Sequence, residues 1–208
     1  MYIPAHFAES GTSEIHRIIE RFPLATLVTT GQRGLDANQI PFELALADGE
    51  PVLLRAHIAR ANPLWQETAE GSAALVIFRA EDAYVSPNWY PSKHLTHRHV
   101  PTWNYQVVNV HGTVRFVQDE KYLRALVGRL TRKHEMNIPG NNPWRMADAP
   151  AEYIDSMLKA IVGIEIEINR VEAKSKLSQN REERDRLAAA DALDKHGHTR
   201  VADAMRNR

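Results

Sequence analysis

The sequence predicts an α+β fold, a small barrel of about six or seven largely antiparallel strands with helices at its periphery. Short β-branched or alternating segments bounded by turn residues recur along the chain, as at 24–30, 52–58 and 161–171. Segments with helical periodicity lie between them, as at 12–22 and 121–133. Hydrophobic residues make up 43% and charged residues 25% of the 208 residues, which is typical of a folded domain with a real core.

The first part of the chain predicts one helix and three strands. The helix over 12–22 carries a capping hydroxyl and then an apolar face: Thr12 or Ser13, followed by Ile15, Ile18, Ile19 and Phe22. Segments 24–30 and 35–44 then read as a hairpin around a glycine-bounded turn, and 52–58 follows as a third strand. Pro41 places a kink or an edge position in the second of these strands.

The middle of the chain predicts a helix, further strands and a long loop. Asn62 is a favoured N-cap and Pro63 a favoured first helical residue, so we expect a helix to begin there and to end near Gly71. The segment 87–105 reads as a loop rich in Pro, His and aromatic residues, and its length favours a functional role. Strands are expected in three segments: 73–78, 83–86 and 107–117.

The last part of the chain predicts the final strand and a helical extension. After the helix at 121–133, a turn-rich connection over 137–150 leads to a short helix over 152–160. Apolar and charged residues alternate over 161–171, as expected for a strand. Residues 181–208 are helical in composition but weakly amphipathic and highly charged, so we expect their end to fray. These features predict one barrel domain over 1–180 and a charged C-terminal helical extension over 181–208.

Composition excludes several classes of function. Cysteine is absent, which rules out disulfides, thiolate nucleophiles, Fe–S clusters and cysteine-ligated zinc. Lys+Arg and Asp+Glu number 26 each, so a formal net charge of zero gives no global attraction to nucleic acid or acidic membranes. No apolar run reaches the roughly 20 residues that cross a bilayer, and the first residues lack the order of a signal peptide, so we expect a cytoplasmic protein without membrane partners.

The sharpest local feature is the segment His57–Trp65, a predicted strand that runs into a capped helix. Free backbone N–H groups and the positive end of a helix dipole converge at such a junction, and Arg60 adds a bidentate donor. His57 adds another donor, so the segment suits a phosphate dianion. The alternative is that Arg60 lies on the surface and Asn62 only caps the helix, and the spacing leaves both interpretations open.

Two aromatic clusters flank the long loop. The first is YVSPNWY at 84–90, and the second is VPTWNY at 100–105. They could wall a flat heteroaromatic ring, with Thr102 or Asn104 making polar contacts to its edge. Alternatively, the aromatic side chains pack in the core or at a subunit interface.

Histidines within the loop and cations after the last strand are two further candidates. His94, His97 and His99 invite a metal interpretation, but their spacing and the lack of Asp or Glu in the cluster favour a solvated loop. The segment 174–181 packs cations, hydroxyls and amides together, which could complete an anion site. A solvated exit loop is the alternative for this segment.

Five segments, in this order, resemble the PaiB-like family of FMN-binding negative transcriptional regulators. They are HIARANP at 57–63, YVSPNWY at 84–90, VPTWNY at 100–105, IVGIEIEI at 161–168 and KLSQNR at 176–181. Five motifs in the right order are more specific than any one of them. The resemblance extends from MYIPAHF at the start of the chain to about Leu193.

The resemblance implies a split β-barrel of the FMN-binding, pyridoxamine-phosphate-oxidase-like type, which forms a homodimer and binds FMN at the subunit interface. It implies that Arg60, with His57 and Asn62, holds the FMN phosphate. Two further groups are implied to lie near the cofactor or across the dimer: Trp103, Asn104 and Tyr105, and Lys176, Ser178, Gln179 and Asn180. Family members often carry Gly where Ala173 stands and His where Gln39 stands, so contacts assigned to these two positions do not carry over.

The family name implies a regulator that lowers gene expression with flavin bound, with DNA or a regulatory protein as its partner. The sequence itself offers no helix-turn-helix, basic recognition helix or zinc finger, and its neutral charge disfavours strong non-specific DNA binding. An FMN-dependent oxidoreductase is the alternative, in which His57, His97 or Tyr105 would act as acid or base if near the flavin. Haem handling is a third hypothesis, because related split barrels include haem-degrading enzymes and the chain has 10 histidines.

Overall fold

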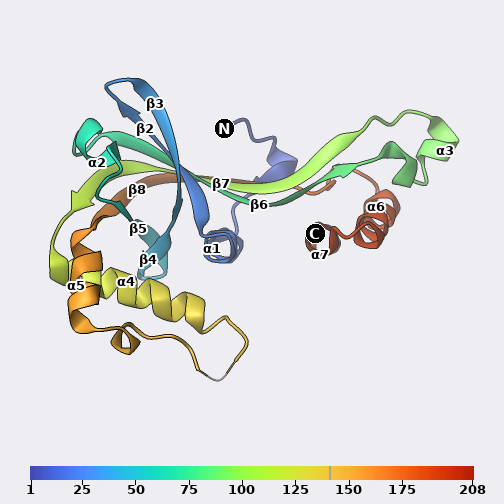
Figure 1. Ribbon diagram of the computed structural model, residues 1–208. Helices are drawn as coiled ribbons and strands as arrows, with labels where there is room; N and C mark the ends of the chain where they lie inside the picture. The colour runs from blue at the N-terminus through green and yellow to red at the C-terminus, as the bar shows by residue number, and fades with distance from the viewer. Residues whose placement is uncertain (141) are drawn as a thin grey trace. The chain divides into compact units, whose positions relative to one another are not determined.

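A computed structural model describes residues 1–140 and 142–208, and its elements are shown in Figure 1. The predicted connection over 137–150 therefore includes one residue, Asn141, outside the described residues. The strands are β1 Ala8–Glu9, β2 Leu24–Gly31, β3 Gly34–Pro41, β4 Glu43–Ala47, β5 Glu50–Ala59, β6 Ala73–Val85, β7 Thr102–Val117 and β8 Ile161–Lys176. The α-helices are α1 Thr12–Arg21, α2 Leu64–Glu67, α3 Lys93–Thr96, α4 Glu120–Glu135, α5 Ala151–Lys159, α6 Glu183–Lys195 and α7 Thr199–Arg206. Three 3-10 helices are η1 Ala5–Phe7, η2 Pro87–Trp89 and η3 Met146–Asp148.

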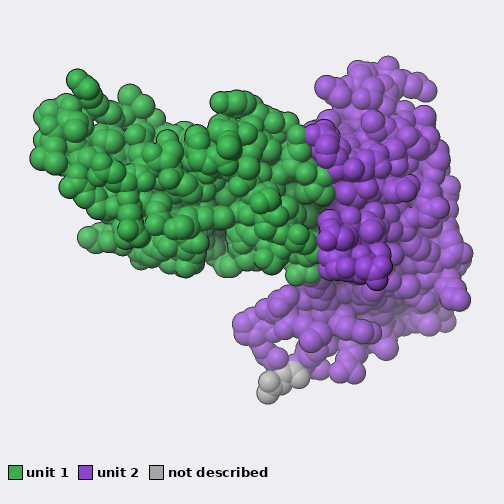
Figure 2. All heavy atoms as spheres, turned by 180° about the vertical axis from the view of Figure 1, so that it is seen from behind, with its two compact units in different colours: residues 1–22, 78–109, 171–208 green, residues 23–77, 110–170 purple. Residues whose placement is uncertain are grey.

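The strands hydrogen-bond in the order β3-β2-β6-β7-β8-β5-β4, with β1 pairing antiparallel to β8. The described chain divides into two compact units, coloured separately in Figure 2. Unit 1 comprises Met1–Phe22, Phe78–Asn109 and Val171–Arg208, and unit 2 comprises Pro23–Ile77 and Val110–Arg170.

Unit 2 is built on antiparallel strand pairs with an apolar interior. In β5, Leu54, Ala56 and Ile58 are buried in alternation, because successive side chains of a strand point to opposite faces. The other face of β5 therefore carries Arg55 and His57, which pair in register with Glu165 and Gly163 of β8. On the helical side of the unit, a small apolar cluster joins α4 and α5: Leu123, Ile154 and Leu158.

Unit 1 has its own core, which the last two helices complete. Helices α6 and α7 lie side by side at the end of the chain (Figure 1). They bury residues against the end of β6, Tyr90 and Leu177, forming one apolar cluster: Ala83, Val85, Tyr90, Leu177, Ala189, Ala190, Leu193, Val201, Ala202 and Met205. In α1, the predicted apolar face is confirmed by Ile18 and Ile19, which have no exposed surface.

The predicted fold class is confirmed, and the differences concern where elements end. The expected strand over 35–44 is interrupted after Pro41, because proline lacks the N–H that a ladder needs, and β4 pairs with β5 instead of β2. The strands expected at 73–78 and 83–86 are one strand, β6, and β8 continues five residues beyond the predicted end at 171, to Lys176. The helix expected from Asn62 to near Gly71 is a single turn, α2.

The charged extension is packed rather than frayed. Its buried residues are Leu193, Val201, Met205, three alanines and two charged residues, Asp185 and Arg186, so its apolar stripe is narrow and easily missed in a charged sequence. The domain boundary at residue 180 stays a prediction. None of the described helices is long and apolar enough to cross a membrane.

Candidate functional site

The guanidinium of Arg60 is fixed by three acceptors within unit 2. Nε donates to the carbonyl oxygen of Lys159 at 2.7 Å, Nη1 to the side-chain oxygen of Gln118 at 2.7 Å, and Nη2 to the carbonyl oxygen of Ile161 at 3.0 Å. Trp65 also contacts Arg60. Its Nε1 donates to the Arg60 carbonyl oxygen at 2.9 Å, and the guanidinium carbon of Arg60 lies 5.7 Å from the centroid of the Trp65 ring. Arg60 is therefore held in place, and two of its five N–H groups remain for another acceptor.

His57 lies on the half-buried face of β5 and contributes an unpaired polar atom. Its Nδ1 is buried and has no hydrogen-bond partner among the described residues. Burial lowers the pKa of His57, so its imidazole is neutral near pH 7 and offers one donor and one acceptor. An unsatisfied buried nitrogen is costly, which is a reason to expect a polar partner at this position.

Asn62 ties the short helix to the neighbouring hairpin. Its Oδ1 accepts a hydrogen bond from the backbone N–H of Leu64 at 3.0 Å, so the predicted capping interaction is present. Its Nδ2 donates to Asn38 of β3 at 2.9 Å. Because α2 has only four residues, the helix dipole expected from the sequence contributes little, and any anion here relies on side-chain donors.

These three residues fit a phosphate group in charge and in donor capacity. Arg60 supplies a fixed positive charge with two free N–H groups, and His57 supplies a neutral ring with an unpaired nitrogen. The exposed side chain of Gln118, which accepts from Arg60, is the group that an anion would replace at lowest cost. The donor set is thus suited to the phosphate of a nucleotide such as FMN.

In unit 1, the second predicted group presents an exposed aromatic face. Trp103 is 53% exposed and Tyr84 is 45% exposed, and their rings meet edge to face with centroids 6.0 Å apart. Tyr105 lies on the same strand as Trp103, two residues along, and the Lys174 ammonium lies 5.3 Å from its ring centroid. Large exposed aromatic side chains that cluster on one face are typical of a binding surface.

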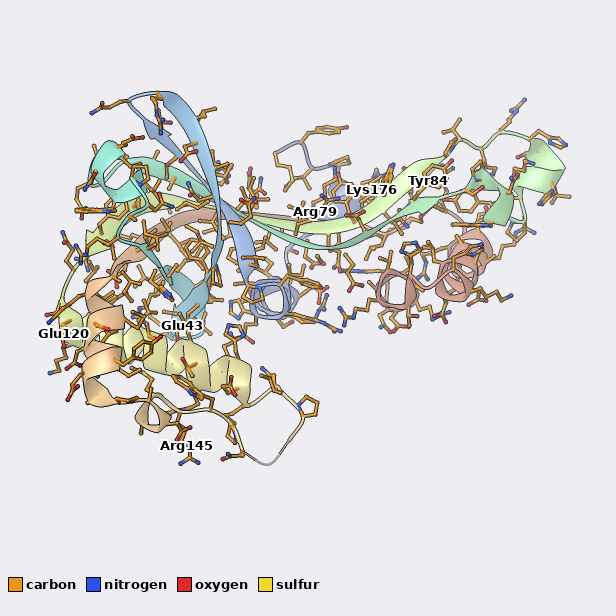
Figure 3. The ribbon with its side chains drawn as sticks, in the orientation of Figure 1. Glu43, Arg79, Tyr84, Glu120, Arg145 and Lys176 are labelled. Carbon is orange, nitrogen blue, oxygen red and sulfur yellow. The ribbon has the colours of Figure 1, made fainter. Side chains whose placement is uncertain are left out.

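Lys176 connects this face to the end of β8. Tyr84 and Lys176 are both labelled in Figure 3, on β6 and β8 respectively. The Lys176 ammonium donates to the Trp103 carbonyl at 2.6 Å and to the Thr102 hydroxyl. Burial, followed by repulsion from Lys174 and Arg181, lowers the pKa of Lys176. A partly desolvated cation is costly unless it is paired, so an anionic partner would stabilise Lys176 in this position.

Asn104 and Ser178, two of the predicted contacts, are engaged inside unit 1. Asn104 has no exposed surface and Ser178 is 3% exposed. The Asn104 Nδ2 donates to the Ser178 hydroxyl at 3.0 Å and to the sulfur of Met205 at 3.2 Å, so it links β7 to α7. Ser178 has a positive φ of 65°, which the fixed position of its side chain helps to maintain.

The other two residues of the C-terminal motif differ in exposure. Gln179 accepts from the Leu177 N–H at 2.7 Å and donates to the Ser175 carbonyl at 2.6 Å, so its amide closes the turn after β8. Asn180 is exposed. Cofactor contacts of the unit 1 residues stay a prediction. Those with accessible surface are Trp103, Tyr105, Lys176, Gln179 and Asn180, and the Gln179 amide is already engaged in the turn.

Sequence reasoning missed a buried carboxylate in unit 2. Glu165 was expected on the charged face of the last strand, but it is 6% exposed. Its Oε2 accepts from Nε of Arg115 at 3.1 Å, and its Oε1 lies 3.8 Å from Arg55, the register partner in β5. Burial, together with Glu165, raises the pKa of Tyr122, so that phenol stays protonated. The alternation of glutamates and isoleucines in β8 was the available signal, but periodicity does not reveal what covers the polar face.

The loop histidines do not gather into a metal site within the described residues. His97 ends α3 with a positive φ of 53°. His99 instead lies against Ser92, with its Nε2 at 2.8 Å from the hydroxyl oxygen, and Ser92 in turn donates its backbone N–H to Asp185 at 3.0 Å. This histidine therefore joins the loop to α6.

Comparison with known proteins identifies the family. Residues 1–170 match the family described as "Putative FMN-binding domain". The chain is similar to the protein named protease synthase and sporulation protein PAI 2 of Bacillus subtilis, with 31% identity over 93% of this chain and 89% of that protein. An uncharacterized protein of Emericella nidulans is also 31% identical, over 89% of this chain and 87% of that protein.

Solved structures share the fold at low sequence identity. The FAD and heme binding protein from Mycobacterium smegmatis has a TM-score of 0.58 and 19% identity, covering 81% of this chain and 72% of that one. The flavocytochrome Anf3 from Azotobacter vinelandii has a TM-score of 0.55 and 15% identity, covering 84% and 72%. At these identities the likeness establishes the fold alone.

The fold and the phosphate-suited donor set define a flavin-binding split-barrel protein. More narrowly, the chain belongs to the PaiB-like family of FMN-binding domains, as the resemblance of its five motifs implied. The cofactor expected from the sequence, FMN, is confirmed at the level of this family.

Proposed function

We propose that the protein is a homodimeric regulator that lowers gene expression and acts with bound FMN. Arg60, His57 and Asn62 hold the phosphate, and the aromatic face of Tyr84 and Trp103 contacts the cofactor or the second protomer. When bound, FMN supplies a redox-active ring whose oxidised and reduced forms differ in charge and shape. The observation that carries the proposal is the fixed Arg60 guanidinium, which keeps two N–H groups without an acceptor among the described residues. The buried Nδ1 of His57, three positions earlier in the chain, has no partner among them either.

The resemblance of five motifs to the PaiB-like family of negative transcriptional regulators supports a regulatory role, and the chain is similar to PAI 2 over nearly the full length of both proteins. The net charge of zero favours regulation through a partner protein, because neutralising many DNA phosphates requires an excess of Lys and Arg. His57 would act on FMN by hydrogen bonding in its neutral form, since burial lowers its pKa. Arg60 and Asn62 would orient the phosphate end and so fix where the ring lies.

The cofactor site is tested by titrating FMN into wild-type protein and the Arg60→Ala variant. Loss of one charge-assisted contact is expected to weaken binding by roughly 10- to 100-fold, from about 1.5–3 kcal/mol. Arg33→Ala is the matched control, because Arg33 is a strongly exposed arginine of the same unit that pairs with Glu67 at the surface. Equal FMN affinity in wild type and Arg60→Ala would refute the phosphate assignment, and a monomeric FMN-loaded protein in light scattering would refute the dimer.

The regulatory role is tested in cells that carry the Arg60→Ala allele. Transcripts that rise on deletion of the gene are expected to rise in Arg60→Ala as well and to stay repressed with Arg33→Ala. Mixing FMN-loaded protein with NADH or NADPH provides the opposing test. If the flavin absorbance bleaches within seconds while transcript levels are unchanged in the deletion strain, the protein is an oxidoreductase and the regulatory proposal fails.

A further inference from the structure

A cavity lies wholly within unit 1, and none of the residues assigned to the FMN phosphate lines it. Its volume is about 410 Å³, within the range of small-molecule sites. Helices α1 and α7 both contribute lining residues, and β6 and β7 contribute Ala80 and Gln106. Gln106 is only 4% exposed, so the cavity reaches a buried polar group.

One end of the cavity is a fixed network of charges. Arg17 donates from Nε to Glu14 at 2.6 Å and from Nη2 to the same carboxylate at 2.8 Å. The buried Gln106 amide donates to Glu14 at 2.7 Å and to Ser175 at 2.9 Å. The hydrogen bond from Arg17 lowers the pKa of Glu14, so this carboxylate stays ionised near pH 7. The polar end of the cavity is therefore held rigidly before any ligand arrives.

The acidic residues that line the cavity are all paired, whereas one arginine is not. Glu14 pairs with Arg17, Glu81 with Arg200, and Asp203 with Arg206. Arg21 also lines the cavity, and no partner for its guanidinium is found in the part of the chain that the structure describes. Nη1 of Arg17 likewise has no acceptor among the described residues. The charged groups of the cavity that lack a described partner are thus the Arg21 guanidinium and Nη1 of Arg17, and both are cationic donors.

Apolar side chains form a large part of the remaining wall. Phe22 at the end of α1 lines this space, as do Leu177, Val201 and Ala204 from the C-terminal part of the chain. Asn207 and Arg208 also line it, and Arg208 is paired with Glu9 and Glu14. An apolar wall with a few convergent donors is the usual form of a site for a small organic ligand. A hydrated inorganic anion would gain nothing from this wall, because apolar burial requires an apolar body.

We propose that this cavity binds a small organic anion, with a carboxylate on Arg21 and Arg17 and an apolar body against Phe22 and Val201. The site deepens the proposed function, because it gives the FMN-loaded regulator a place for an effector, and in that respect it rests on that function. The binding itself is independent of it. Carboxylate recognition by arginine is geometrically specific, since two parallel N–H groups match two oxygens.

Benzoate is the probe, added to ¹⁵N-labelled protein in FMN-loaded and FMN-free samples. Saturable shifts of the amide signals of α1 and α7 are expected in both samples. Benzamide tests the charge and acetate tests the apolar body, and each is expected to bind at least about tenfold more weakly than benzoate. Arg21→Gln is expected to weaken benzoate by roughly tenfold, and Arg33→Gln, in the other unit, is expected to leave it unchanged.

Four outcomes would overturn the proposal. These are equal binding of benzamide and benzoate, equal binding of acetate and benzoate, no effect of Arg21→Gln, and displacement of benzoate by FMN. Arg21 is exposed and has no described partner, so its replacement is not expected to disturb folding. FMN binding is read separately from flavin absorbance, so failure of the cofactor site and failure of this cavity give different results.

Discussion

Replacing Asn104 with alanine tests whether this residue supports the fold or contacts the cofactor. Asn104 is fully buried and donates to Ser178 and to Met205. Without it, the Ser178 hydroxyl, on a residue that is 3% exposed, loses its described partner. An unsatisfied buried hydroxyl costs about 1–3 kcal/mol, and the lost net hydrogen bonding costs about 1 kcal/mol more.

We therefore expect Asn104→Ala to lower the free energy of unfolding by about 2–4 kcal/mol. For a chain of this size, that corresponds to a fall in Tm of roughly 4–16 °C. The measurement is urea unfolding of FMN-free protein followed by circular dichroism, with Asn180→Ala as the matched control. Asn180 is exposed, so its change is expected to stay within about 0.5 kcal/mol.

The reasoning is refuted if Asn104→Ala unfolds at the same urea concentration as wild type but binds FMN at least tenfold more weakly. That result would make Asn104 a cofactor contact, as the family resemblance implies, rather than a link between β7 and α7. A loss of stability with FMN affinity retained in the folded fraction supports the structural role.

Three further predictions concern close packing and titration. Gly112→Ala would place a Cβ 2.1 Å from the Glu167 carbonyl oxygen, so we expect the free energy of unfolding to fall by about 3 kcal/mol or more, or the protein to be insoluble. A Tm near that of wild type would contradict the close packing of the strands. Gly128→Ala, in contrast, meets only the Met146 sulfur at 3.6 Å on a helix, and is expected to raise stability by about 0.5–1 kcal/mol in the same melting assay. Burial lowers the pKa of His57 below its ordinary value of 6.5, so the unfolded chain takes up the proton first and the free energy of unfolding is expected to fall as the pH drops below 6.5. The measurement is urea unfolding between about pH 7 and 5, in which His57→Gln is expected to weaken this pH dependence. An unchanged pH dependence in the variant would disprove the role of His57.

The sequence predicted the fold class but not the order of the strands in the sheet. Alternation identified β8, because apolar residues on one face of a strand leave a period of two. The β-branched, apolar composition of 24–30 identified β2, and the turn before 52–58 identified β5. The merging of two predicted strands into β6 was not visible, since Glu81 and Asp82 interrupt the apolar run where the strand continues. Periodicity records burial on a face and not hydrogen bonding along the chain.

The candidate site was predicted as a set of positions, and its chemistry came from the structure. The motif around Arg60 located a phosphate-suited segment, but the expected helix dipole depended on a helix that is one turn long. The three acceptors that fix the guanidinium, Lys159, Ile161 and Gln118, lie about 60–100 residues away in the chain, so no local pattern could name them. Glu165 was missed for the same reason, because its burial is created by neighbouring elements.

The apolar cluster of unit 1 bears on how the protein can be trimmed for experiments. The family match ends at residue 170, yet α6 and α7 cover Val85 and Tyr90. A fragment that ends at that boundary would expose this apolar surface to water and would be prone to aggregate, whatever its affinity for flavin. The aggregation state of a shortened protein is therefore best measured by sedimentation before its flavin absorbance, since weak absorbance could result from lost folding as well as from a lost cofactor.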